Sequence, residues 1–155
     1  MMKFILYISV LFISYQSIGN SQATSKMRDL FTKVDQDEKY NTQLKNLTDS
    51  ATEKTPIAYG YKALYYFMNA KYVFWPTDKL SNFSTGKSYL EQVIKLYPNE
   101  AELRLIRYSV QYNVPSLLNY SHNMEEDKKI LQRAAFHSKY EDIRALINGV
   151  LNKYP

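Results

Sequence analysis

Apolar residues recur at helical spacing along most of this chain, and helix start and stop signals separate the recurring stretches. Met27, Leu30 and Val34 fall at positions i, i+3 and i+7, which lie on one face of a helix. No segment shows the sustained alternation of apolar and polar residues that indicates a half-buried strand. With 4 glycines and 5 prolines, the chain also has few of the turn residues that a β-sandwich needs. The pattern predicts an all-α protein.

The N-terminal half is predicted to form one long or two short helices, followed by a well-marked third. A second apolar stripe continues the first after a charged interval, at Tyr40, Leu44, Leu47 and Ala51. Thr55 and Pro56 mark the next helix start, because Thr is a favoured N-cap and a proline in the first turn leaves no N–H unbonded. This helix is expected to end near Phe74, since the residue before a proline avoids the α region.

A loop of about ten residues, 74–83, is expected next, because Trp75 precedes Pro76 and is pushed into an extended conformation. The following helix is predicted over residues 84–97, with Pro98 as its stop signal. In this region Gly86 is expected to lie at a close approach of two helices.

Repeated polar start signals open the C-terminal helices. Each places a capping side chain three residues before an acid, as in Asn99 with Glu102, Asn123 with Glu126 and Ser138 with Glu141. The first of these helices is expected to run to Val114. The acidic cluster Glu125, Glu126 and Asp127 would lie in the first turn of the second, where anions stabilise the helix N-terminus. The chain is thus divided into about five or six helices, which short connections would pair into antiparallel hairpins.

Part of this pattern resembles a known repeat. Gly86, Leu90, Val93 and Pro98 have the spacing of the second helix of a tetratricopeptide repeat (TPR): a small residue, a large one four later, a small one three further, then a proline. The resemblance implies stacked helical hairpins. An irregular helical bundle is the alternative, because the pattern does not recur after Pro115.

A second resemblance covers residues 57–129. The segments 58–63, 79–83 and 125–128 are similar to those of a group of uncharacterised exported proteins from Bacteroidota bacteria. This resemblance implies a provenance and no activity.

Residues 1–23 have the three parts of an export signal. Lys3 supplies a positive start, residues 4–13 are predominantly apolar, and Ser21 and Ala23 place small residues before a cleavage point. The apolar stretch is shorter than the roughly 20 residues that span a bilayer. We expect cleavage after Ala23, a single all-α domain over residues 24–155, and a periplasmic or secreted protein without stable membrane insertion. A retained N-terminal anchor is the alternative.

The composition excludes several kinds of site. Cysteine is absent, so neither disulfides nor a cysteine nucleophile is expected. The formal net charge of +5 is carried by scattered lysines and arginines, which argues against a nucleic-acid partner. His122 and His137 lack the spacing of helical metal ligands, and the few glycines form no phosphate-binding loop. We expect no catalytic residue, cofactor or metal.

Two apolar stripes mark the helix that begins at Pro56. One consists of Ile57, Tyr61, Leu64, Tyr65, Met68 and Tyr72, and the other of Tyr59, Tyr66 and Val73. A helix with two apolar faces is usually packed between neighbours. The alternative is that Tyr59 and Tyr66 face a partner.

Further along the chain, the loop around Trp75 would either plug the end of the bundle or form a flap over a ligand. Arg104, Arg107 and Gln111 interrupt an apolar helix at i, i+3 and i+7. They are expected to form a solvated or ion-paired edge, or else a groove that receives carboxylates.

These observations favour an exported, non-enzymatic helical domain that binds a protein or peptide partner in the cell envelope. The expected contact residues are Tyr59, Tyr66, Trp75, Arg104, Arg107 and Gln111. The alternative is a domain that binds a small molecule or envelope polymer in a pocket under the Trp75 loop.

Overall fold

The computed structural model describes residues 22–50 and 55–155, and every regular element among them is a helix. Residues 22–31 are helical. They are followed by α2 (Glu38–Ser50), α3 (Pro56–Tyr72), α4 (Pro76–Leu96), α5 (Ala101–Asn113), the 3-10 helix η1 (Ser116–Leu118), α6 (Met124–Ala134), the 3-10 helix η2 (Ser138–Ile143) and α7 (Arg144–Lys153). The all-α prediction is confirmed.

The predicted export signal lies outside the described residues except for residues 22 and 23, which belong to the first helix. Ala51 of the second apolar stripe also lies outside them. Within the described part of the chain, no helix combines the length and the apolar character that crossing a membrane requires.

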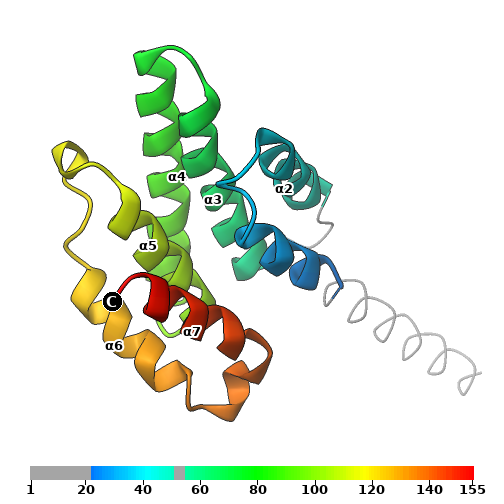
Figure 1. The fold of residues 1–155 in the computed structure, drawn as a ribbon, viewed down its shortest axis with the longest axis vertical. Coiled ribbons are helices and arrows are strands. Elements are labelled where there is room, and N and C mark those ends of the chain that lie inside the picture. The colour runs from blue at the N-terminus through cyan, green and yellow to red at the C-terminus, as the bar shows by residue number, and fades with distance from the viewer. Residues whose placement is uncertain (1–21, 51–54) are drawn as a thin grey trace, which may run out of the picture.

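A long antiparallel hairpin of α3 and α4 runs between α2 and α5, and one end of it extends past the neighbouring helices (Figure 1). α2 packs against α3, while α5 contacts both helices of the hairpin. α6 pairs with α5, and α7 packs against both α5 and α6. The TPR-like stacking of these hairpins stays a prediction.

The helix α5 joins two apolar cores. Leu103 and Ile106 belong to a core that includes Tyr61 and Leu64 of α3. On the other side of α5, Leu105 packs into a second core built with α6 and α7. Because residues 101–108 are all buried, α5 is enclosed by its neighbours on every side, which is typical of a central helix.

The first apolar stripe of α3 has a similar explanation, since α2, α4 and α5 all contact this helix, whereas Tyr59, Tyr66 and Val73 of the second stripe stay partly exposed. Its start is also as expected. The Thr55 hydroxyl accepts a hydrogen bond from the N–H of Ala58 at 3.2 Å, and Pro56 occupies the first turn.

Gly86 lies at the predicted close approach of two helices. A Cβ atom placed there would stand 2.9 Å from the carbonyl oxygen of Ala63 and 3.2 Å from the ring of Phe67. Both neighbours belong to α3, so this glycine permits the close packing of the α3–α4 hairpin.

The prediction of a ten-residue loop after α3 is wrong. Only residues 73–75 connect the two helices, and α4 begins at Pro76. Trp75 is extended, with φ −76° and ψ 136°, as the residue before a proline should be. The same proline occupies the first turn of α4, where its missing N–H costs nothing. It therefore ends one helix and starts the next, as Pro56 starts α3.

Some C-terminal start signals act differently from the prediction. The N-cap of α5 is Glu100 in place of Asn99, and Asn123 makes no side-chain cap hydrogen bond at α6. Residues 138–143 form the 3-10 helix η2, so α7 begins only at Arg144. The Nδ1 atom of His137 accepts a hydrogen bond from the N–H of Lys139 at 3.2 Å and caps η2.

Candidate functional site

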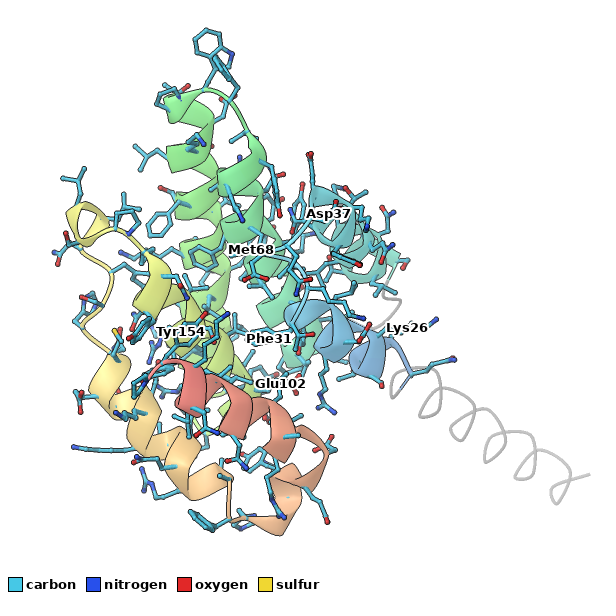
Figure 2. All side chains as sticks on the ribbon, viewed as in Figure 1. Lys26, Phe31, Asp37, Met68, Glu102 and Tyr154 are labelled. Atoms are coloured by element: carbon cyan, nitrogen blue, oxygen red, sulfur yellow. The ribbon has the colours of Figure 1, made fainter. Side chains whose placement is uncertain are left out.

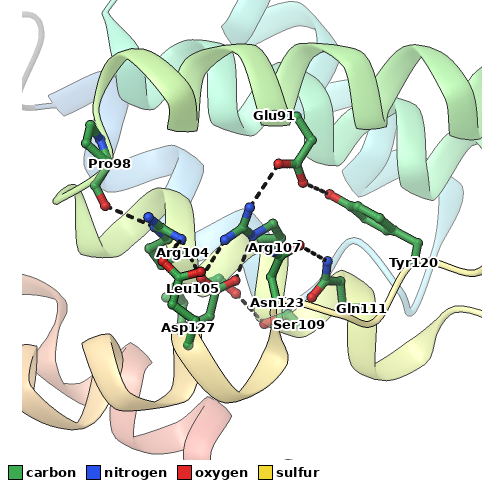
Figure 3. Close-up of polar contacts among 11 residues, drawn as sticks. Glu91, Pro98, Arg104, Leu105, Arg107, Ser109, Gln111, Tyr120, Asn123 and Asp127 are labelled. Carbon is green, nitrogen blue, oxygen red and sulfur yellow. Dashed lines mark hydrogen bonds and ion pairs between the residues drawn. The ribbon is translucent and has the colours of Figure 1, made fainter.

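The polar residues predicted on α5 are in the interior. Arg104, Arg107 and Gln111 keep 6%, 3% and 2% of their surface exposed. The expectation of a solvated edge is therefore wrong, whereas the expectation of ion pairing holds. All three point into the space between α4, α5 and α6 (Figure 3).

Asp127 of α6 is the centre of this arrangement and is itself fully buried. Its two carboxylate oxygens accept hydrogen bonds from Nε and Nη2 of Arg107 at 2.7 and 2.8 Å. Nη1 of Arg104 donates to the same carboxylate at 2.9 Å. Asp127 lies in the first turn of α6, as predicted, but in addition two arginines of α5 reach its carboxylate.

The network of Asp127 and the two arginines continues toward α4 through Glu91. One Glu91 oxygen accepts from Arg107 at 2.9 Å, and the other accepts from the hydroxyl of Tyr120 at 2.5 Å (Figure 3). Burial, and then the neighbouring Glu91, raise the pKa of the Tyr120 hydroxyl well above its usual range. Together these contacts tie α4, α5, α6 and the segment after η1 to one another.

The arginines are mostly engaged by acceptors of their own chain. Arg104 also donates to Glu126 at 3.1 Å and to the carbonyl of Pro98 at 3.0 Å. Two cations thus face three carboxylates of their own chain, namely those of Glu91, Glu126 and Asp127. The predicted groove for partner carboxylates is occupied from within.

A second buried network, which the sequence analysis missed, surrounds Glu102 in the middle of the molecule (Figure 2). Its carboxylate accepts two hydrogen bonds from Arg28, at 2.9 and 2.7 Å, and one from the hydroxyl of Tyr61 at 2.8 Å. Burial, and then the charge of Glu102, raise the pKa of Tyr61. Glu102 lies in the first turn of α5, as predicted, and it also links α5 to α3 and to the N-terminal helix.

Tyr59 and Tyr66, by contrast, are brought together at the surface. The ring of Tyr89 from α4 lies between them, with ring centroids 6.4 Å from Tyr59 and 5.7 Å from Tyr66. The planes of Tyr66 and Tyr89 differ by only 10°, and Tyr65 meets Tyr66 edge-on at 5.0 Å. We call Tyr59, Tyr89 and Tyr66 the tyrosine row.

All three rings of the row are partly exposed. None of the three hydroxyls has a hydrogen-bond partner among the described residues. None of them is among the buried polar atoms that lack a partner.

Charged groups from α2 and α3 border the tyrosine row. The ammonium of Lys62 lies 6.0 Å from the centre of the Tyr89 ring and pairs with Asp49 at 3.1 Å. Lys45 also pairs with Asp49, at 2.6 Å, and lies 6.0 Å from the ring of Tyr65. The row thus combines flat, partly exposed rings with a mixed charged rim.

Tyr89 is not among the predicted contact residues, although the sequence contains a signal for it. Tyr89 follows Gly86 by three residues, and residues three apart share a face of a helix. Since Gly86 faces α3, the Tyr89 ring must also lie toward α3.

Trp75 projects from the end of the α3–α4 hairpin. It is 63% exposed, and the adjacent Phe74 is 81% exposed. Two hollows lie elsewhere, along α6 and between α6, η2 and the start of α5. The flap over a ligand is a wrong prediction, because residues 76–83 form the first turns of α4.

Both histidines are exposed, and His137 is engaged in the cap of η2. Across residues 22–50 and 55–155, no group of three or more His, Cys, Asp or Glu side chains is arranged to hold a metal ion.

No protein-family model matches the chain, and comparison with curated proteins and with solved structures found no match. Any function must therefore be argued from the arrangement of the residues themselves.

Proposed function

We propose that the protein is an exported, non-enzymatic helical domain that binds a protein or peptide partner in the cell envelope through the tyrosine row. The observation that carries this proposal is the stacking of Tyr59, Tyr89 and Tyr66 from two helices, with all three rings partly exposed.

Tyrosine is well suited to such a surface. Its ring supplies a large contact area at a low cost in side-chain entropy, and its hydroxyl adds a hydrogen bond. Tyrosine is also enriched among the residues that dominate the binding free energy of protein interfaces. Stacking fixes the three rings before binding, so little ordering remains to be done when a partner arrives.

The rim suits a peptide or protein surface of mixed charge. Lys45 and Lys62 share one carboxylate, that of Asp49, so the region has one more positive than negative charge. A partner that offers a carboxylate could pair with either ammonium. The pocket under Trp75, which would favour a small-molecule ligand, has no observation in its support.

The proposal is tested by site-directed photo-crosslinking in the cells that produce the protein. Tyr66 is replaced by the photoreactive analogue p-benzoylphenylalanine, which keeps an aromatic ring at this position. We expect one discrete cross-linked species, whose partner mass spectrometry identifies.

The matched control carries the same analogue at Phe136, which is 89% exposed at the end of α6 and distant in sequence from the row. It should give no discrete species. Cross-links of equal yield from both positions, or from Phe136 alone, would contradict the proposal.

A further inference from the structure

The connection between α3 and α4 carries an exposed apolar group that the fold does not use. Phe74, Trp75 and Leu80 keep 81%, 63% and 55% of their surface exposed. The Phe74 and Trp75 rings pack edge to face, 5.1 Å apart. We call these three residues the hairpin tip.

The hairpin tip is placed where no other part of the described chain covers it. It occupies the end of the α3–α4 hairpin that extends past its neighbours, shown in green in Figure 1. This end is convex, and neither described hollow lies near it. Clustered exposed apolar residues mark a surface that meets a protein or a membrane. A convex tip fits a deformable lipid surface without a matching groove.

Two lysines stand behind the aromatic residues. The ammonium of Lys71 donates to the carbonyl of Asp35 at 2.6 Å, and that of Lys79 lies 3.5 Å from the carbonyl of Lys71. Within the described residues, neither ammonium forms an ion pair with a carboxylate. The acids nearby are Asp78, in the first turn of α4, Asp35, which lies 3.9 Å from Lys153, and Asp37 and Glu38, whose charges reach Tyr72 next to Lys71.

This order of groups is that of a membrane-interface anchor. Tryptophan prefers the boundary between headgroups and acyl chains, while Phe and Leu enter the apolar layer just beneath it. Lysines one level behind would meet the phosphates of anionic lipids.

We infer that the hairpin tip inserts shallowly into the headgroup region of an anionic lipid membrane and holds the domain at that surface. This contact is separate from the tyrosine row, so each can be present without the other. It is also peripheral, since only the turn and the first residues of α4 enter the lipid.

The experiment uses the full chain and vesicles of phosphatidylethanolamine and phosphatidylglycerol. Trp75 is the one tryptophan of the sequence, so its fluorescence reports on the tip alone. We expect a blue shift of the emission on adding vesicles and quenching by lipids brominated near the headgroup. Attachment through another part of the chain would leave Trp75 in water.

Variants then test which residues make the contact with lipid. Phe74→Ala should raise the lipid concentration at half-maximal blue shift by about tenfold or more, because one aromatic ring is no longer buried. Lys71→Gln with Lys79→Gln should raise it by roughly fivefold for each charge removed. Phe136→Ala, and Lys95→Gln with Lys129→Gln, remove matched groups elsewhere and should leave the titration unchanged.

The inference is overturned if Trp75 keeps its emission in water at saturating lipid while circular dichroism shows the helices intact. It is equally overturned if the control variants weaken the response as much as the tip variants do. A photoreactive group at Phe74 that cross-links to a protein in cells, and not to lipid, would assign the tip to a protein partner instead.

Discussion

Asp127 has no exposed surface, yet it bears a charge that two arginines share. A buried ion pair contributes little net stability compared with apolar residues of the same volume, but removing one partner leaves the other charge buried and uncompensated. Asp127 therefore stabilises the fold mainly because it neutralises the buried charges of Arg104 and Arg107 between α5 and α6.

Asp127→Asn should lower the free energy of unfolding by on the order of 3–5 kcal/mol, because both guanidiniums lose their shared anion. Urea denaturation measures the change. Glu126→Gln is the control: its side chain is 58% exposed although it contacts Arg104, so the expected loss is below about 1 kcal/mol. Equal losses in the two variants would show that Asp127 is not the centre of the network.

The two buried tyrosines make stability depend on alkaline pH. Burial, reinforced by Glu102 and Glu91, raises the pKa of Tyr61 and of Tyr120 in the folded protein. In the unfolded chain both hydroxyls titrate near the ordinary value of about 10. The stabilisation from keeping them protonated is therefore complete below about pH 10 and is lost as the pH rises through the folded-state pKa.

We accordingly expect the free energy of unfolding to fall steadily above about pH 10, as followed by urea denaturation across a pH series. Tyr120→Phe should be less stable near neutral pH by about 1 kcal/mol, since Glu91 loses a hydrogen bond. It should also show a shallower alkaline decline. An identical slope in the variant and the wild type would mean that Tyr120 does not contribute.

At the scale of elements, prolines separate the helices, but a proline has two meanings in sequence. It can stop the helix before it, and it can occupy the first turn of the helix after it. Both apply at Pro76, so α3 and α4 are joined by only three residues. When Pro76 is taken only as a stop signal, the sequence predicts a loop where the structure has the first turns of α4.

The close pairing of α3 and α4 predicts a cost for any side chain at Gly86. Gly86→Ala should destabilise the protein by on the order of 1–3 kcal/mol, because the new methyl group meets the backbone carbonyl of Ala63, which cannot rotate away. Thermal unfolding followed by circular dichroism measures this change.

Gly149→Ala is the matched control. This glycine lies in α7 with nothing within 4 Å of an added Cβ, so the substitution should stabilise by up to about 1 kcal/mol through helix propensity alone. A gain in stability at both glycines would contradict the close approach.

For the whole molecule, the fold class and most helix positions follow from sequence, because periodicity and capping are local properties. The burial of Arg104 and Arg107 does not, since the spacing of residues on one helix does not tell which neighbour covers that face. Tyr59 and Tyr66 could be paired from their separation of two helical turns. Tyr89 completes the row only once the packing of α3 on α4 is known.

Two groups of residues that the sequence predicts as partner contacts are thus assigned opposite roles. The arginines of α5 hold the interior together, whereas the tyrosine row is proposed to meet a partner. The most direct test measures affinity and stability together, using the partner that cross-linking at position 66 identifies.

We expect Tyr66→Ser to weaken partner binding by about tenfold or more while the melting temperature falls only slightly, because the ring is partly exposed. Arg107→Met should lower the melting temperature strongly and leave the affinity of the protein that remains folded unchanged. Unchanged affinity in Tyr66→Ser, or a loss of binding in Arg107→Met under conditions where the protein is folded, would contradict this assignment.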